Sequence, residues 1–524
     1  MKQFIPAWYD SNNWWDSAVV PFYIKRKTTE FDDMVSLMLM HHKNNEPFNT
    51  IILNYNPLLR LFLHRHELYE MNYWSLFDEI QGATHGTPVA IDYRELSWPE
   101  DTEFIYTPFQ VLAIKSDNQF SKMIFSQEGY LICIEDYEHK TLSRKLIFDD
   151  RGFVSSIEIY HDGQSPMKRY YLAVKGQIIM TQDFMTEKIT IQPEFYDLFQ
   201  KKSYGNMDEL IFEKIQQYNT STLADDDKVI IAADKRYNYV LTDTFKPENM
   251  CFSLFSQRNA YIDATLLETI GKANQCIVDT QANATKLNQF ITQNPEYQPF
   301  KIMRVTPFDA QMLPNISSQL YETNIGVWID SLSEEDLKTV IDQLSQYVSQ
   351  HEQTIIHLLT RLNENDIQQW LRDEIDQLNA LLNVEEEEFS PEVQDILQTE
   401  LEEDEIEKVK LIYVPFEEDL MKELSQLRVI VDLNQEPDLY LQISSISAGV
   451  PQINRRETDY VDDKLNGLII DNIQQLRVAL NYFINNLKNW NYSFAHSIKL
   501  SDEFSSEKII QRLNSVIEGE IHGT

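Results

Sequence analysis

The sequence predicts an α/β protein built from two parallel-sheet units, with an antiparallel β-sheet module inserted into the first. Three observations lead to this prediction. Short apolar runs alternate with amphipathic helical patterns over residues 1–100 and again after residue 205, which is the rhythm of a parallel sheet. Residues 101–205 instead alternate as strands separated by closely spaced turn signals. A second α/β pattern begins near Asn324.

The order of these patterns sets the expected domain boundaries. Residues 1–100 and 206–315 should form an N-terminal Rossmann-like domain, residues 101–205 the inserted antiparallel domain, and residues 316–524 a C-terminal Rossmann-like domain. A length of 524 residues is enough for about three or four domain-sized pieces. The acidic segment 384–407 lies within the last domain. We expect a solvated helix or loop there, with a docking strip for a basic partner as the alternative.

The elements of the first domain follow from its apolar pattern. Apolar residues three and four apart predict one amphipathic helix on Phe31, Met34, Leu37 and Met38. Short apolar runs predict strands at 1–8, 48–55, 228–234 and 275–279.

In the inserted domain, Gly, Asn and Asp mark the expected hairpin turns at 116–118, 128–129, 150–152, 161–163 and 175–176. In the second unit, strands are expected at 326–330 and 354–359. The helix between these two strands should place its apolar face on Leu337, Val340, Ile341 and Leu344.

Charge and composition narrow the class of protein. Lys and Arg number 45 against 83 Asp and Glu, a net charge of −38, which disfavours nucleic acid as a partner. The same net charge opposes direct binding to an anionic membrane, so membrane contact should be peripheral, through partner proteins or a small basic patch such as Lys25–Lys27. The preferred interpretation of this patch is a solvated surface cluster. Three separated cysteines, no signal peptide and no long apolar run indicate a cytoplasmic protein, with at most peripheral attachment to the cytoplasmic membrane.

The motifs of common enzyme classes are missing from the sequence. It contains no GxGxxG, no phosphate-binding loop of the Walker type, no GxSxG, no HExxH and no EF-hand loop. Glycine is also scarce, 13 of 524 residues, although phosphate-cradling loops depend on it. The densest histidine cluster is at residues 64 and 66, with His41 and His42 upstream. His64 and His66 would lie on the same face only if their segment were a strand, and no third ligand is evident. We therefore favour surface or structural histidines over a metal site. We therefore expect no cofactor and no metal.

Aromatic residues gather near the start of the chain. They are Trp8, Tyr9, Trp14 and Trp15. Core and edge packing explains them without further function, and a glycan or protein partner is the alternative if they are exposed.

The most specific pattern lies near the carboxyl end. Residues 444–453, which contain Gly449-Val450-Pro451, are followed by Asn466-Gly467 and by 504–509. Between the last two we expect one helix with its inward residues at Ile473, Leu476, Leu480, Phe483 and Leu487. This succession resembles the donor-domain end of retaining glycosyltransferases of the GT-B fold, which have two facing Rossmann-like domains.

The resemblance implies a degenerate donor cleft. Such enzymes carry two glutamates eight residues apart before the Gly-Val-Pro turn. Counting back from Gly449, Glu436 stands at the first position and Ser444 at the second. The family therefore implies that the carboxylate expected at residue 444 is missing.

The cations that hold a nucleotide diphosphate are missing as well. The enzymes that this chain resembles carry an Arg and a Lys at the first strand-to-helix turn of the donor domain. At these positions this chain has Ser331 and Asp336. Each such cation contributes about 1.5–3 kcal/mol through charge-assisted hydrogen bonds, and a carboxylate adds repulsion. Lys338 is the one nearby residue that could compensate. We therefore expect no catalytic residues and no enzyme activity.

The whole chain is similar to one family. The segments 4–9, 14–15 and 21–23, the inserted sheet around residues 151–153 and the degenerate Gly-Val-Pro region resemble the first of the accessory secretory proteins of Gram-positive bacteria. That resemblance implies a non-catalytic factor of the accessory Sec system, working with two sibling accessory secretory proteins and the Sec motor ATPase. The implied cargo is a serine-rich-repeat glycoprotein adhesin, delivered for export across the cytoplasmic membrane.

Two alternatives stay open from the sequence. One is an active GT-B glycosyltransferase that modifies the adhesin, for which Glu436 and Lys338 are the supporting residues. The other is a general chaperone that binds the unmodified serine-rich polypeptide.

Overall fold

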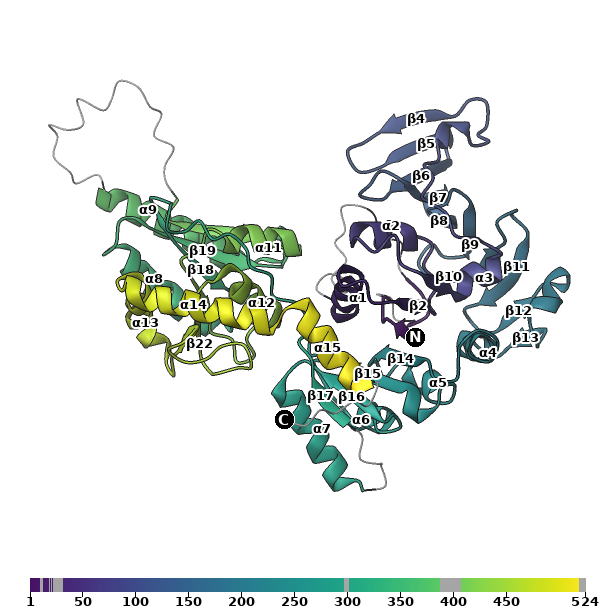
Figure 1. Cartoon of the computed structure of the whole chain (residues 1–524). Helices are drawn as coiled ribbons and strands as arrows, with labels where there is room; N and C mark the ends of the chain where they lie inside the picture. The colour runs from purple at the N-terminus through teal and green to yellow at the C-terminus, as the bar shows by residue number, and fades with distance from the viewer. Residues whose placement is uncertain are drawn as a thin grey trace. The chain divides into compact units, whose positions relative to one another are not determined.

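The computed structural model describes residues 1–9, 13–17, 19, 21, 32–295, 301–386 and 407–517. Lys25–Lys27, Phe31 and most of the acidic segment 384–407 lie outside these residues. The chain divides into two compact units, Met1–Pro307 together with Ile510–Thr524, and Phe308–Ile509. Each unit is described by itself below (Figure 1).

The first unit contains a parallel sheet in the order β17-β16-β15-β14-β1-β2-β3. Strand β1 is buried along its whole length and ends at Ile5, because Pro6 follows and has no N–H for a sheet hydrogen bond. The strands are β1 (Lys2–Ile5), β2 (Phe48–Ile52), β3 (Tyr73–Ser75), β14 (Lys228–Ala232), β15 (Met250–Leu254), β16 (Gln275–Val278) and β17 (Lys301–Arg304).

Helices connect these strands, and side-chain caps fix where several of them begin. Asp32 accepts hydrogen bonds from the backbone N–H groups of Met34 and Val35, at 3.0 and 3.1 Å, which starts the predicted amphipathic helix as α1. The helices of this sheet are α1 (Asp33–Lys43), α2 (Leu59–Arg65), α3 (Leu76–Gln81), α4 (Met207–Ser221), α5 (Asn238–Thr242), α6 (Ala264–Ile270) and α7 (Gln281–Gln293).

Between β3 and β14 the chain forms a ten-stranded antiparallel sheet in which each strand pairs with the next along the chain. The predicted turns fall between its strands. At the β9–β10 turn, Gly163 has φ +76°, and a Cβ there would lie 2.9 Å from the Thr141 side chain. The strands are β4 (Glu103–Tyr106), β5 (Val111–Ser116), β6 (Gln119–Phe125), β7 (Leu131–Glu138), β8 (Thr141–Phe148), β9 (Val154–Tyr160), β10 (Pro166–Leu172), β11 (Ile178–Asp183), β12 (Ile189–Ile191) and β13 (Ser203–Tyr204).

The second unit contains a parallel sheet in the order β20-β19-β18-β21-β22-β23. Gly326 lies in the central strand, where a Cβ would come within 2.4 Å of the Leu427 side chain, so a larger residue would have to displace this leucine. The strands are β18 (Thr323–Trp328), β19 (Thr354–Thr360), β20 (Val409–Tyr413), β21 (Val429–Asp432), β22 (Gln452–Asn454) and β23 (Gly467–Ile469).

Seven helices are described in or after this sheet. They are α8 (Glu334–Val348), α9 (Gln369–Glu386), α11 (Glu417–Leu424), α12 (Leu439–Ala448), α13 (Leu476–Ile484), α14 (Leu487–Glu503) and α15 (Ser506–Ile517). One prediction about them is wrong. The chain breaks between α13 and α14 instead of continuing as one helix, so Leu487 begins a new helix and is 58% exposed. From Ile510 onward the chain belongs to the first unit, where the Gln275 side chain donates to the Val516 carbonyl at 2.8 Å.

The N-terminal aromatic residues are core residues, as the packing interpretation predicts. All four, Trp8, Tyr9, Trp14 and Trp15, are at most 7% exposed. The indole N–H of Trp8 donates to Asp32, and that of Trp14 donates to Asp208. Because both rings and their polar atoms are satisfied inside the first unit, these residues do not form an exposed glycan platform.

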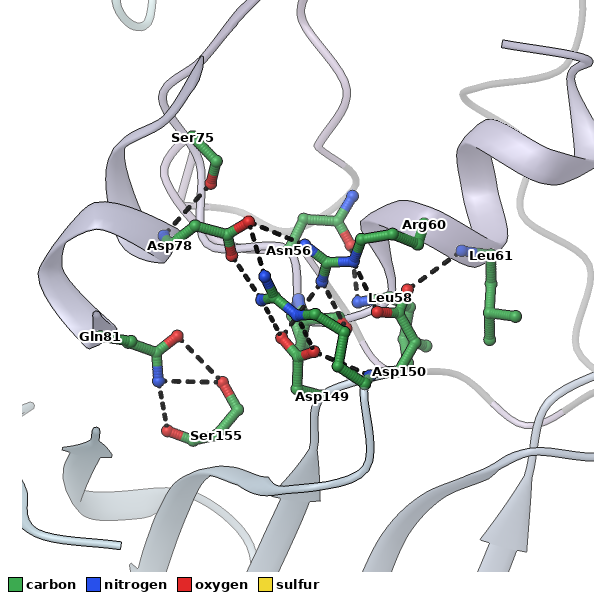
Figure 2. A network of polar contacts seen from close by, with 12 residues as sticks. Asn56, Leu58, Arg60, Leu61, Ser75, Asp78, Gln81, Asp149, Asp150 and Ser155 are labelled. Carbon is green, nitrogen blue, oxygen red and sulfur yellow. Dashed lines mark hydrogen bonds and ion pairs between the residues drawn. The ribbon is translucent and has the colours of Figure 1, made fainter. Parts of the chain in front are cut away.

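A buried ion-pair network joins the first parallel sheet to the antiparallel sheet (Figure 2). Arg60 of α2 contacts Asp78, Asp149 and Asp150 at 2.8, 3.1 and 2.6 Å. Arg151 contacts Asp78 and Asp149, each at 2.7 Å. Burial raises the pKa of Asp150 to about 6, against the opposing effect of Arg60. The two guanidinium groups therefore hold the β8–β9 turn against helices α2 and α3.

We predict that Arg60→Leu destabilises the first unit by about 3–5 kcal/mol, because it leaves Asp150 buried without its arginine and removes one of the two arginines that contact Asp149. Chemical denaturation measures this loss. Arg65→Leu on the same helix is the matched control. Its ion pair with Glu128 is about one-third exposed, so the loss should stay below about 1 kcal/mol. Equal effects of the two substitutions would contradict the role given to the network.

Candidate functional site: the carboxyl edge of the second-unit sheet

Three of the five predicted donor-site residues lie on both sides of the point where the strand order reverses. The chain leaves β18 for β19 on one side, whereas β21 continues to β22 on the other. Ligands of open α/β sheets bind at the carboxyl ends of the strands at such a switch point. Ser331 and Asp336 follow β18, and Glu436 follows β21. We call the loops after β18, β19 and β21, with the first turns of α8 and α12, the carboxyl edge.

Ser331 lies in the turn between β18 and α8 with a left-handed backbone, φ +67°. This conformation costs a non-glycine residue about 1 kcal/mol. The side chain is exposed and bears no charge, so nothing in it replaces the arginine that the resemblance expects.

The start of α8 already carries its own negative charges. Ser333 caps the helix by accepting from the Asp336 N–H at 3.1 Å, and Glu334, Glu335 and Asp336 fill the first turn. A helix N-terminus attracts anions, and here carboxylates of the chain occupy that position.

The cations near this turn have partners within the chain. Arg455, from the loop after β22, contacts Asp336 at 3.0 Å. Lys338 contacts Glu334 at 2.6 Å and lies over the Trp370 ring at 4.8 Å. The compensating role that the sequence left open for Lys338 therefore requires breaking an existing ion pair.

Glu436 has an arginine partner of its own. Arg456, next to Arg455 in the loop after β22, pairs with it. Both side chains are substantially exposed, so this contact adds little to stability. It does place a cation on the carboxylate that the resemblance assigns to a donor sugar.

The partly buried centre of the carboxyl edge consists of residues that sequence reasoning missed. The Arg361 side chain pairs with both carboxylate oxygens of Asp438, at 2.7 and 3.1 Å, while its backbone N–H donates to Asp330 at 2.9 Å. Asp432 accepts from the Asp438 N–H at 2.7 Å. Burial raises the pKa of Asp330, and it raises the pKa of Asp432 to about 6. Asp330, Arg361 and Asp432 each stand at or just after a buried strand, which is the sequence signal that could have found them.

Ser444 and Gly449 are not on the exposed edge. Ser444 is 3% exposed within α12, a helix buried on all sides. Gly449 ends this helix with φ +64°, and a Cβ there would lie 2.3 Å from the Phe494 ring of α14. Burial within α12 explains Ser444 as a packing position, and the close approach of Phe494 explains Gly449 as one.

The structure therefore separates the five predicted residues into two groups. Asp336 and Glu436 lie on the edge and contact neighbouring arginines, and Ser331 lies on the turn before Asp336. Ser444 and Gly449 belong to the helix packing. Over the described ranges, no group of three or more His, Cys, Asp or Glu side chains could hold a metal ion, and His64 lies in helix α2 instead of a strand.

The family model described as an accessory Sec system protein, the first of the accessory secretory proteins, matches residues 1–519. The chain belongs to this family. A curated member from Staphylococcus aureus (strain NCTC 8325 / PS 47) is 42% identical over the full length of both chains. The accessory Sec assignment made from the sequence resemblance is thus confirmed.

Two solved structures show the same architecture. The Streptococcus pneumoniae structure of accessory secretory proteins 1, 2 and 3 contains a chain that is 27% identical, with a TM-score of 0.82 and 99% of each chain covered. The pneumococcal O-GlcNAc transferase GtfA, solved with UDP and GlcNAc, is 14% identical, with a TM-score of 0.69, 100% of this chain and 99% of that chain covered. The second match concerns the fold alone, and it confirms the predicted GT-B-like class.

No membrane-spanning helix is found in the part of the chain that the structure describes. None of the described helices is both long enough and apolar enough to cross a bilayer.

The raised pKa of Asp432 gives a pH-dependent prediction. The Asp432 carboxyl binds its proton more tightly in the folded state than in the unfolded chain. Its protonated form therefore stabilises the folded state fully below about pH 4, and this stabilisation is lost as the pH rises through about 6. Asp432→Asn removes this loss. Relative to the native chain, its free energy of unfolding should rise by about 1 kcal/mol between about pH 5 and pH 7.

Denaturation of the second unit at the two pH values measures this difference. Asp471→Asn, at an exposed position, is the control and should follow the native chain. A pH response of Asp432→Asn identical to that of the native chain would contradict the assignment.

Proposed function

We propose that this protein is a non-catalytic, cytoplasmic component of the accessory Sec export system. It binds two sibling accessory secretory proteins and the Sec motor ATPase, and it delivers a serine-rich-repeat glycoprotein adhesin for export across the cytoplasmic membrane. Family membership supports the export role, and the Streptococcus pneumoniae relative, solved with proteins 2 and 3, supports the sibling complex.

The observation that carries the non-catalytic part is the Asp336–Arg455 ion pair. A nucleotide diphosphate needs cations at the turn between β18 and α8, and Asp336, at the start of α8, is instead a carboxylate that pairs with Arg455. Binding a diphosphate there would require Arg455 to leave Asp336, which would then repel the ligand. Each absent cation removes about 1.5–3 kcal/mol of binding energy.

The charge of the chain fits a role in protein assembly. A net charge of −38 opposes direct attachment to an anionic leaflet. Delivery to the membrane therefore goes through the motor ATPase and the sibling proteins. An excess of carboxylates also favours partners with basic surfaces.

Export of the adhesin tests this function in the native cell. Cells without the chain should retain the adhesin, and both the native chain and Ser331→Arg with Asp336→Lys should restore surface display to the same level, because no donor chemistry is needed. Asp342→Lys, an exposed change on the same helix α8, is the charge control.

A change in export with the double variant but not with Asp342→Lys would contradict the proposal. So would purified protein that transfers sugar from a nucleotide-sugar and loses this activity on Glu436→Gln. That result would establish the alternative, an active GT-B glycosyltransferase.

A further inference from the structure

The two edges of the antiparallel sheet are different. The edge strand β13 has only two residues, and its Tyr204 is 1% exposed. The opposite edge strand, β4, has four residues, of which Ile105 is 47% and Tyr106 64% exposed (Figure 1). Monomeric proteins protect edge strands by keeping them short, charged or covered. β13 has two residues and its Tyr204 is buried, whereas β4 has four residues, ends in two exposed apolar side chains and carries one charge, at its first residue Glu103.

The register of β4 shows which backbone groups face outward. The Thr107 N–H donates to the Gln110 carbonyl at 3.0 Å and closes the β4–β5 hairpin. Hydrogen-bonded pairs alternate along an antiparallel ladder, so Ile105 bonds β5 while Phe104 and Tyr106 turn their N–H and C=O groups away from it. Over the described residues, no strand pairs with this outer side. A strand from another chain has the complementary row of donors and acceptors.

Apolar surface accompanies these backbone groups. Phe109, in the hairpin turn, is 57% exposed, so three large apolar side chains are exposed within five residues. Ile105 also lies opposite the partly exposed Leu112 of β5, which extends the apolar surface to the next strand. Apolar residues concentrated on an open edge are typical of a surface that another protein covers.

The exposed charges around β4 indicate which kind of partner strand is complementary to this edge. Glu95, Glu100, Asp101 and Glu103 are all exposed on the segment that leads into the strand. A second copy of this chain would bring the same carboxylates to the interface, and like charges there cost affinity. An apolar strand flanked by Lys or Arg is complementary to this edge.

We propose that β4 binds a β-strand of one of the sibling accessory secretory proteins, an apolar strand with basic flanks that adds to the antiparallel sheet. Main-chain hydrogen bonds to Phe104 and Tyr106 give affinity, and Ile105 and Phe109 supply the apolar contacts. The inference rests on the sibling complex of the proposed function and adds the surface that forms it.

Binding of the full chain to the purified sibling proteins tests the edge, with biolayer interferometry as the readout. Ile105→Lys places a charge among the exposed apolar side chains of the β4 edge. Tyr106→Pro removes an outward N–H while sparing the hydrogen bonds to β5. Met185→Lys, an 82% exposed position in the β11–β12 turn, is the matched control. Far-UV circular dichroism confirms that each variant is folded.

We expect Ile105→Lys and Tyr106→Pro each to weaken sibling binding by about tenfold or more, with Met185→Lys unchanged and the native affinity falling as salt rises. If the native chain binds the siblings and both β4 variants bind equally well, the edge is not the docking surface, and the proposed function is unaffected. If the native chain binds neither sibling, the proposed complex itself is wrong. Loss of self-association in Ile105→Lys would identify a second copy as the occupant and overturn the proposal.

Discussion

A carboxylate taken out of water must be neutralised where it lies, and both units are organised around this constraint. In the first unit, Arg60 and Arg151 neutralise the buried acids that join the parallel and antiparallel sheets. In the second unit, Arg361 pairs with Asp438 beside Asp330 and Asp432. Removing either partner of such a pair leaves an uncompensated charge, so these positions are fixed by folding before any ligand is considered.

The same constraint limits what the carboxyl edge can bind. In the glycosyltransferases that this chain resembles, cations at this edge bind the diphosphate of the donor. In this chain Arg455 and Arg456 already have the partners Asp336 and Glu436. The scaffold therefore keeps the GT-B-like fold, while Arg455 and Arg456 at its edge are paired within the chain. Under the proposed function, the surfaces of the fold serve assembly, and the open edge of the antiparallel sheet is the surface that we propose for it.

The sequence predicts local features well because they depend on neighbours. The period of the apolar residues predicts α1 and α8, and the turn residues predict the hairpins of the antiparallel sheet. The succession of residues 444–453, Asn466-Gly467, a helix and 504–509 resembles GT-B enzymes, and this resemblance gives the GT-B-like class. One helix expected through Leu487 is wrong, because two consecutive asparagines, Asn485 and Asn486, break it. Asparagine competes for backbone hydrogen bonds and favours helix ends.

Long-range pairing accounts for the remainder. Arg60 meets Asp150 ninety residues later, and Arg361 meets Asp438 seventy-seven residues later. No local pattern encodes either contact. The sequence also places Ser444 near a sugar site, and only the packing of α12 shows it buried within the helix layer.

Calorimetric titration of the full chain with UDP-GlcNAc tests the central claim most directly. An edge whose charges are paired internally gives no saturable heat at millimolar ligand, and Ser331→Arg with Asp336→Lys increases the affinity by restoring the cations. One-site binding to the native chain in the micromolar range, abolished by Asp432→Asn or Arg361→Gln, would show that the edge still accepts a diphosphate donor and would contradict the account.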